Sequence, residues 1–278
     1  MTTSVFLIVL AAALLHASWN AIIKTGGDKL TGLLMVALGD GLVGIAVAMA
    51  RPVPGMEVWP WILASGIIRT VYMLFLGYAY VHGDLSRVYP IARGAAPLFV
   101  LLVSGLLLSD QISTKEFAGI IVLGGGILLM AQGALANGES RRLLPLAVGS
   151  AMATAGYSIV DGTGARLAGD AIAFVSWALA VTAMFYLPVV IALRGRSVLP
   201  ADKRAWGFGV VAGSVSYLAY AIVVWAMTQA PIVLVAALRE TSILFAVLIG
   251  WLVFGEKMHK SKLIAAGLIV FGVAITRL

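Results

Sequence analysis

The sequence contains no cysteine and few charged residues. Without cysteine, the chain can form no disulfide, no thiolate nucleophile and no cysteine-based metal site. Charged residues make up 11% of the 278 residues, whereas a soluble domain of this size carries about a quarter. Hydrophobic residues reach 62%, and the mean hydropathy is +1.04. This composition predicts an integral membrane protein and leaves no room for a soluble catalytic domain.

The short motifs of common enzyme classes are also missing. There is no HExxH zinc motif and no GxSxG nucleophile elbow, and the three histidines are scattered at positions 16, 82 and 259. The glycines from Gly124 to Gly126 are not followed by the Lys-Ser or Lys-Thr pair of a phosphate-binding loop. We therefore expect no catalytic residue, no metal site and no cofactor, and we predict that the chain is not an enzyme.

The formal net charge of +7 does not indicate a nucleic-acid partner. The lysines and arginines lie mostly in short connections between apolar runs and form no stripe along one surface. Positively charged connections are what membrane insertion produces. We expect the lipid bilayer and a small-molecule substrate as partners, and no nucleic acid.

Ten apolar runs follow one another along the chain. A spanning helix needs about 20 apolar residues, and an apolar run in lipid satisfies its backbone hydrogen bonds as a helix. The polar–apolar alternation of a membrane barrel is missing. We predict an all-α membrane protein with ten transmembrane helices, the first retained and not cleaved as a signal sequence. The predicted spans are Ser4–Ile22, Thr31–Ala50, Trp59–Val81, Ser86–Leu108, Glu116–Ala134, Leu143–Gly164, Ala171–Leu193, Trp206–Thr228, Pro231–Phe254 and Ser261–Ile275.

The two halves of the sequence resemble each other at an offset of 146 residues. Arg93 then aligns with Arg239, and Asp110, 17 residues further on, aligns with Glu256. An arginine inside an apolar run, followed at the same distance by an acid that ends the run, rarely occurs twice by chance. We predict a first repeat at 1–136, a linker at 137–142 and a second repeat at 143–278. Because each repeat holds five spans, an odd number, the second is inverted, as in many transporters.

The charges of the connections predict an orientation. Eleven basic residues lie on one side and four on the other, so the positive-inside rule places the first side in the cytoplasm and both termini outside. The first side carries Lys24, Lys29, Arg141, Arg142, Arg194, Arg196, Lys203, Arg204, Lys257, Lys260 and Lys262, and the second carries Arg51, Lys115, Arg166 and Arg277.

Six charged residues fall inside the predicted spans. A charge at the bilayer centre costs about 2.5–3.5 kcal/mol on insertion scales, so these side chains should face the protein interior and have partners. Arginine binds carboxylates or phosphates through two parallel hydrogen bonds. A buried carboxylate can exchange a proton near neutral pH, which makes the acids candidates for proton coupling. The arginines are Arg69, Arg93 and Arg239, and the acids are Asp40, Asp161 and Glu240.

These charges allow two interpretations. In one, the acids neutralise the arginines and tie helices together. In the other, some of them line a cavity and bind the charged ends of a solute, together with polar and aromatic residues on the same helix faces. For His16 and Asn20, an interhelical hydrogen bond is the alternative to cavity lining. The substrate-binding candidates are His16, Trp19, Asn20, Arg69, Tyr72, Tyr89, Arg93, Tyr217, Tyr220, Arg239 and Glu240.

Several segments resemble the drug/metabolite transporter superfamily with EamA-type repeats. His16-Ala-Ser-Trp-Asn-Ala-Ile-Ile-Lys24 is similar to the opening helix of that family, and Val88-Tyr-Pro-Ile-Ala-Arg-Gly94 to the end of its first repeat. Ala237-Leu-Arg-Glu-Thr-Ser242 and Phe254-Gly-Glu256 are similar to the end of its second repeat. The resemblance implies a ten-helix inverted fold around a central cavity, with helices five and ten standing apart. It places in that cavity Trp19, Asn20, Tyr89, Arg93, Tyr217, Arg239 and Glu240.

The resemblance does not name a cargo. Members of the superfamily export amino acids and other metabolites, exchange phosphorylated compounds or sugar nucleotides, or move lipid-linked sugars. The family pattern commonly has glutamate where this chain has Asp110. It also implies cytoplasmic termini, opposite to the orientation that the charges of the connections predict.

These observations predict a secondary active transporter of the plasma membrane. Arginines and acids in one cavity suit an amino-acid-like zwitterion or an organic anion, moved by alternating access. The alternative is a flippase for a lipid-linked or phosphorylated substrate, which needs a cavity open to the bilayer. The glycine-rich fifth and tenth spans are expected at the periphery or at a dimer seam, which allows a homodimer.

Overall fold

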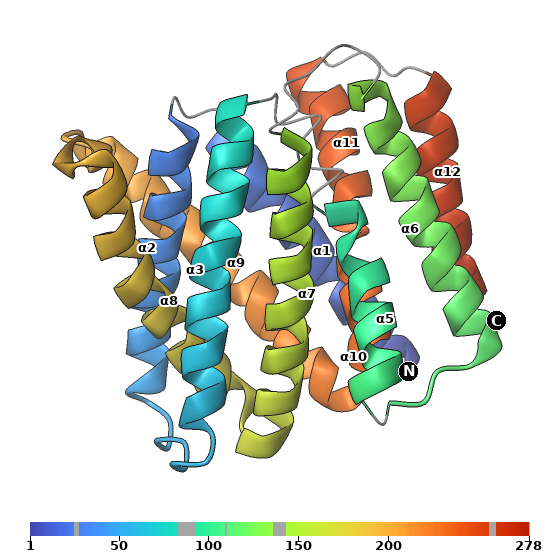
Figure 1. Cartoon of the computed structure of the whole chain (residues 1–278), viewed down its shortest axis with the longest axis horizontal. Helices are drawn as coiled ribbons and strands as arrows, with labels where there is room; N and C mark the ends of the chain where they lie inside the picture. The colour runs from blue at the N-terminus through green and yellow to red at the C-terminus, as the bar shows by residue number, and fades with distance from the viewer. Residues whose placement is uncertain (25–27, 83–92, 109, 136–142, 256–259, 278) are drawn as a thin grey trace.

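The computed structural model describes residues 1–24, 28–82, 93–108, 110–135, 143–255 and 260–277. All regular structure within these residues is helical, and the helices stand side by side in one bundle (Figure 1). The α-helices are α1 (Thr3–Lys24), α2 (Lys29–Ala48), α3 (Trp59–His82), α5 (Ala96–Leu107), α6 (Thr114–Leu135), α7 (Leu143–Ala168), α8 (Ala171–Arg194), α9 (Lys203–Gln229), α10 (Ile232–Arg239), α11 (Ser242–Phe254) and α12 (Lys260–Ile275).

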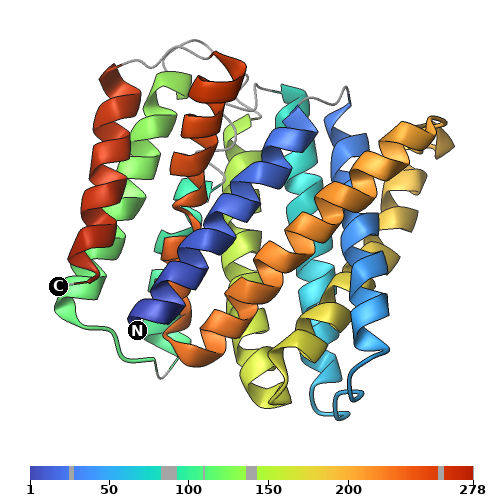
Figure 2. The same cartoon turned by 180° about the vertical axis from the view of Figure 1, so that it is seen from behind.

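Both chain ends lie on one face of the bundle, which we call the terminal face (Figures 1 and 2). The Arg277 guanidinium donates to the Met1 carbonyl at 3.0 Å and to the Thr3 hydroxyl at 2.9 Å. The opposite face, which we call the distal face, carries Asp28 at the start of α2 and Asp202 at the start of α9. The described helices connect these two faces, as spanning helices connect two membrane surfaces.

Several helix starts are fixed by polar side chains that cap unpaired backbone N–H groups. Asp28 accepts from the Thr31 amide at 3.0 Å, and Asp170 accepts from two amides at 3.0 Å each at the start of α8. At the start of α6, Ser113 and Glu116 form a reciprocal capping box, with distances of 2.8 and 3.2 Å. These residues give the apolar runs sharp ends at the two faces.

The helices have the length and apolar surface of a multi-pass membrane protein. Six of the described segments are long and apolar enough to cross a membrane, counting α10 and α11 together as Ile232–Phe254. Large apolar side chains also point outward, among them Leu7, Phe208 and Leu252, each more than half exposed. Such surface is unfavourable in water and suited to lipid.

The ninth predicted span is not one continuous helix. α10 ends at Arg239 and α11 begins at Ser242, with Glu240 and Thr241 between them. Backbone bonds there connect residues three apart, such as Glu240 N–H to the Ala237 carbonyl at 3.1 Å. The predicted span Pro231–Phe254 matches the apolar segment Ile232–Phe254, but the sequence did not predict its interruption after Arg239. The side chains of Arg239, Glu240 and Thr241 are all buried in the bundle here. Hydrogen bonds between residues three apart replace the regular bonds between residues four apart.

The fourth predicted span is likewise broken where the structure describes it. Arg93 and Gly94 are helical, Ala95 bends, and α5 follows from Ala96 with Pro97 in its first turn. Proline lacks an N–H and is accepted at a helix start but not in a helix interior. The first part of the predicted Ser86–Leu108 span lies outside the described residues.

Close backbone contact holds α2 against α9. A Cβ atom built on Gly39 would lie 2.5 Å from the Gly209 carbonyl oxygen, and one on Gly213 would lie 2.5 Å from the Gly39 Cα. Only glycine permits this approach. α9 in turn packs against α1, and Figure 2 shows these two helices tilted together across the bundle. The first and second halves of the sequence are thereby packed against each other.

α6 and α12 form a separate pair at one edge of the bundle (Figure 1). Gly126 contacts Ile269, and Gly272 packs against the backbone of Gly119 and Leu123. Of the glycines expected to serve close helix contact, Gly126 and Gly272 do so between these two helices. Gly124 instead meets Leu98 of α5, and a Cβ atom on Gly125 or Gly267 would meet no atom within 4 Å. The part of the glycine-rich surface that makes these contacts is covered within the chain, so it does not form a dimer seam.

Candidate functional site

A buried ion pair connects α3 to α7 in the middle of the bundle. Arg69 Nη2 lies 3.1 Å from Asp161 Oδ2, and Arg69 Nε lies 3.3 Å from the same oxygen. The Tyr220 hydroxyl of α9 donates to this oxygen at 2.6 Å. The Asp161 side chain is fully buried and that of Arg69 nearly so. A buried charge needs such partners, because removing either one leaves the other uncompensated.

Tyrosine rings enclose the Arg69 guanidinium. Its Cζ lies 3.8 Å from the centroid of the Tyr220 ring and 4.4 Å from that of Tyr157. Tyr157 makes edge-to-face contacts with Tyr72 at 5.5 Å and with Tyr220 at 6.0 Å. Arginine stacks well on aromatic faces, since its planar charge is weakly hydrated. These three rings form an aromatic wall around one arginine.

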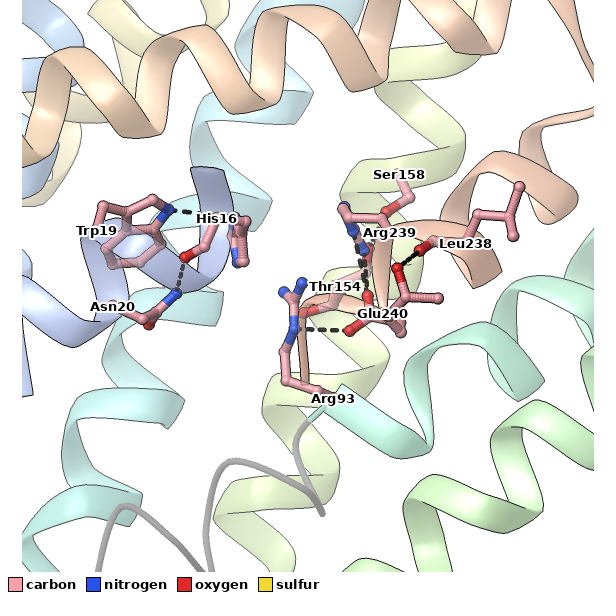
Figure 3. A network of polar contacts seen from close by, with 10 residues as sticks. His16, Trp19, Asn20, Arg93, Thr154, Ser158, Leu238, Arg239 and Glu240 are labelled. Atoms are coloured by element: carbon pink, nitrogen blue, oxygen red, sulfur yellow. Dashed lines mark hydrogen bonds and ion pairs between the residues drawn. The ribbon is translucent and has the colours of Figure 1, made fainter. Parts of the chain in front are cut away.

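A second charged group lies where α10 breaks from α11 (Figure 3). Glu240 Oε1 lies 3.1 Å from Arg239 Nε and 3.0 Å from Arg239 Nη2. Glu240 Oε2 lies 2.8 Å from Arg93 Nε. All three side chains are at most 2% exposed. One carboxylate therefore binds two arginines, one from each half of the sequence.

Tyr157 joins the two charged groups. Its ring centroid lies 5.7 Å from the Arg239 Cζ and 4.4 Å from the Arg69 Cζ. The joined set, which we call the arginine cluster, holds three guanidiniums and two carboxylates. Its members are Arg69, Arg93, Arg239, Asp161, Glu240, Tyr72, Tyr157 and Tyr220. With every group ionised, the positive charge exceeds the negative by one, a balance that suits an anionic ligand.

The cluster also contains buried polar atoms without a hydrogen-bond partner in the described part of the chain. They include Arg239 Nη1, Asp161 Oδ1 and the Thr154 hydroxyl on the neighbouring turn of α7. Figure 3 places Thr154 beside Arg93 and Glu240. Buried donors and acceptors are normally satisfied, so this centre can offer hydrogen bonds of both kinds to a polar molecule.

His16 of α1 faces the cluster (Figure 3). Arg93, Arg239 and Arg69 are the charged groups whose fields act on its ring. Its Nδ1 accepts from Trp19 Nε1 at 3.2 Å, and its carbonyl accepts from the Asn20 amide at 2.7 Å. Both hydrogen bonds stay within α1. The described contacts therefore include no hydrogen bond from His16 or Asn20 to another helix.

Two candidates lie in a separate polar neighbourhood. Asp40 Oδ2 accepts from the Ser216 hydroxyl at 3.2 Å, and the Tyr217 hydroxyl shares a 2.6 Å hydrogen bond with Ser176 of α8. No ion pair within 4 Å to Asp40 occurs among the described contacts. The expectation that three acids pair with three arginines is therefore met for Asp161 and Glu240 alone. Tyr217 is directed toward α8 and not into the arginine cluster.

A surface pocket of about 480 Å³ lies elsewhere, at the distal face between α1, α2 and α9. Its polar lining includes Asp28, Thr31 and Arg204, and none of the three cluster arginines reaches it. Partial burial raises the pKa of the Asp28 carboxyl, but hydrogen bonds from Thr31 and Leu30, together with the charge of Arg194, outweigh burial and hold the pKa below its ordinary value. Trp19, packed on Val36 and Ala212, forms a small apolar cluster next to this pocket.

Comparison with known proteins now decides the family. The model of the EamA-like transporter family matches residues 3–132 and again residues 142–278, nearly the whole chain. This chain belongs to the EamA-like transporter family. It is a membrane transporter of the drug/metabolite transporter superfamily, as its sequence motifs predicted.

A curated relative and a solved structure are similar to this EamA-like transporter. A protein of Archaeoglobus fulgidus described as an uncharacterized transporter is 27% identical over 105 residues, which span 37% of each chain. A protein of known crystal structure superposes with a TM-score of 0.75 at 22% identity, over 100% of this chain and 99% of that one. At this identity the structural likeness supports the fold alone.

Most sequence-predicted candidates of this EamA-like transporter lie together. The structure brings Arg69, Tyr72, Arg93, Tyr220, Arg239, Glu240 and Asp161 into the cluster. Tyr89 lies outside the described residues, as does Glu256. No group of three or more histidine, aspartate or glutamate side chains that could hold a metal occurs among the residues described.

Sequence reasoning missed Tyr157, which joins the two charged groups. A signal was present in α7, where Ser150, Thr154, Tyr157 and Asp161 recur at spacings of four, three and four. Residues at these spacings share one helix face. All four are buried, although a face turned to lipid would be apolar. This polar stripe points from α7 into the cluster.

Proposed function

We propose that this chain is a secondary active transporter for a small polar metabolite that carries an anionic group, an amino-acid-like zwitterion or an organic anion. It works by alternating access between two inverted five-helix repeats, 1–136 and 143–278, joined at 137–142, in the plasma membrane. The observation that carries this proposal is the convergence of three buried arginines, two carboxylates and a wall of tyrosines between the halves.

The chemistry of the cluster supports the cargo class. The guanidiniums supply bidentate donors for a carboxylate or phosphate. Asp161 and Glu240 offer acceptors for an amino group, and both are candidates for proton coupling, as is Asp40. Tyr72, Tyr157 and Tyr220 provide apolar rings with polar edges, which can cover a short carbon skeleton.

The arrangement of the helices supports the mechanism. α1 runs from the terminal face to the distal face, whereas α7, the first helix after the linker, runs the opposite way (Figure 1). The family model matches once before this linker and once after it. The break between α10 and α11 places Glu240 near the bundle centre, and discontinuous helices commonly form the binding sites of such carriers.

Transport by reconstituted protein tests the proposal. Uptake of single L-amino acids and short dicarboxylates into proteoliposomes would be compared for wild type, Arg93→Ala, Arg239→Ala and Arg51→Ala. Losing one partner of a buried charge pair costs about 2 kcal/mol or more, roughly thirtyfold in apparent affinity. Arg51 pairs with Asp170 at the terminal face with its side chain 45% exposed, so its variant is the matched control.

Two results would count against this function. Unchanged transport in both cluster variants removes the arginines from cargo binding. Movement of a lipid-linked substrate between leaflets, without uptake of any soluble compound, would favour the flippase instead.

A further inference from the structure

The two halves of the sequence supply matching arginines, Arg93 and Arg239, but do not supply matching carboxylates beside them. At the offset of 146 residues, Arg93 corresponds to Arg239, whereas Gly94 corresponds to Glu240. A Cβ atom on Gly94 would lie 2.6 Å from Cγ2 of Ile127, so the first half has no space for a side chain there. The pair of guanidiniums thus comes from both halves, and the carboxylate that the described contacts place on it, Glu240, comes from the second half.

Glu240 binds this pair in the way that a ligand's acid group would. One of its oxygens accepts two bonds from Arg239, at 3.1 and 3.0 Å, and the other lies 2.8 Å from Arg93 Nε. A carboxylate that joins two guanidiniums, one at each oxygen, uses the positions that a cargo carboxylate or phosphate would need. A second anion in the same place would meet Glu240 at close range in a buried site, where like charges repel more strongly than in water.

The backbone around Glu240 allows its side chain to move away. Glu240 lies after the last residue of α10 and before α11, where bonds between residues three apart replace regular helix bonds. A change of side-chain direction here need not break a continuous helix. Whatever displaces Glu240 also acts on the connection between α10 and α11, which couples occupancy of the arginines to the relative position of two helices.

We propose that Glu240 is a built-in substitute for the anionic group of the cargo, which compensates one of the two positive charges of Arg93 and Arg239 in the empty transporter and is displaced when cargo binds. This inference rests on the proposed function and identifies the residue that sets its anion affinity. Glu240 keeps the arginines compensated while the site is empty, because uncompensated buried charges are strongly unfavourable. In the empty transporter, Glu240 therefore competes with the cargo anion for Arg93 and Arg239.

Binding of simple anions tests this role without a known cargo. Purified protein in detergent would be titrated with sodium acetate and with sodium phosphate, against sodium chloride at equal ionic strength, and thermal unfolding recorded. Removing the competitor by Glu240→Gln should lower the anion concentration for half-maximal stabilisation about tenfold. Glu57→Gln makes the same chemical change at an exposed position and should leave that concentration unchanged.

Two further variants keep the test decisive. Glu240→Gln combined with Arg239→Gln has the net charge of the wild-type cluster but only one arginine of the pair. This double variant should not bind acetate or phosphate more tightly than wild type does. If Glu240→Gln alone does not fold, Glu240→Asp, whose shorter side chain withdraws the carboxylate, should show a smaller gain in the same direction.

The outcomes separate this inference from the function on which it rests. If acetate and phosphate stabilise wild type and Glu240→Gln at equal concentrations, Glu240 is not a competitor, while anion binding stands. If neither anion stabilises any variant more than chloride does, anion binding by the cluster fails and this inference fails with it.

Discussion

Single residues in the centre of this transporter combine charge with aromatic packing. Arg69 donates to Asp161 while its guanidinium lies against the rings of Tyr220 and Tyr157. Tyr220 serves both partners, because its ring covers the arginine and its hydroxyl donates to the carboxylate at 2.6 Å. A buried ion pair is tolerated only when its remaining hydrogen-bonding capacity is used. The hydroxyl of Tyr220 is therefore expected to contribute as much as its ring.

Replacement of Tyr220 by phenylalanine separates these contributions. Tyr220→Phe keeps the ring on Arg69 but removes a hydrogen bond to a charged group, which is worth roughly 1.5–3 kcal/mol. Tyr186→Phe is the matched control, since the Tyr186 hydroxyl is buried and has no hydrogen-bond partner in the described structure. We expect a lower thermal unfolding midpoint for Tyr220→Phe, and an equal or higher one for Tyr186→Phe. Equal midpoints for Tyr220→Phe and wild type would remove the energetic role of this bond.

At the scale of helices, the sequence predicted the ends of the spans better than it predicted the breaks within them. Apolar length predicted where α2 and α8 begin, at Thr31 and Ala171 against the observed Lys29 and Ala171, because it is a local property. The break after Arg239 was missed, since no glycine or proline marks it in the sequence. Tyr157 was missed although it lies on a polar face of α7, because the sequence does not tell that this face meets α3.

The intramembrane charges were the most informative part of the sequence. Arg69, Arg93 and Arg239 were expected to converge because lipid disfavours isolated charge, and they do. The same rule could not tell that Asp40 accepts a hydrogen bond from Ser216 and forms no ion pair within 4 Å in the described part of the chain. Which of the six charges pair with each other depends on helix rotation and tilt, and the hydropathy of the sequence predicts neither.

The contact between α2 and α9 depends on glycine. Gly213→Ala would place a Cβ atom 2.5 Å from the Gly39 Cα, in backbone that cannot yield without separating the two helices. Overpacking of this kind costs about 1–3 kcal/mol. Gly207→Ala, in the same helix with no atom within 4 Å of the added Cβ, should be neutral or stabilising. Thermal unfolding of the two variants in detergent measures the difference, and equal midpoints would show that the seam is not tightly packed.

For the whole molecule, the terminal face is closed by a bridge between several elements. Arg166 at the end of α7 donates to both oxygens of Asp110, at 2.6 and 3.1 Å. It also donates to the carbonyls of Met227 and Ala230, at 2.9 Å each, at the end of α9. Asp110 accepts from the Ile232 amide at the start of α10, at 2.8 Å. α7, α9, α10 and the segment before α6 must separate from one another if this face is to open.

Because the chain has no cysteine, a single introduced cysteine reports access from each face without interference. Thr154→Cys places a thiol in the arginine cluster, where a charged, membrane-impermeant thiol reagent must pass one face to reach it. Arg166→Gln weakens the bridge and should speed labelling from the terminal face severalfold. Labelling from the distal face should stay the same or slow, since alternating access opens one side at a time. Arg51→Gln breaks an exposed pair on the same face and should leave both rates unchanged, because exposed pairs contribute little. Faster labelling from both faces would mean that Arg166 stabilises the whole bundle and does not gate one side.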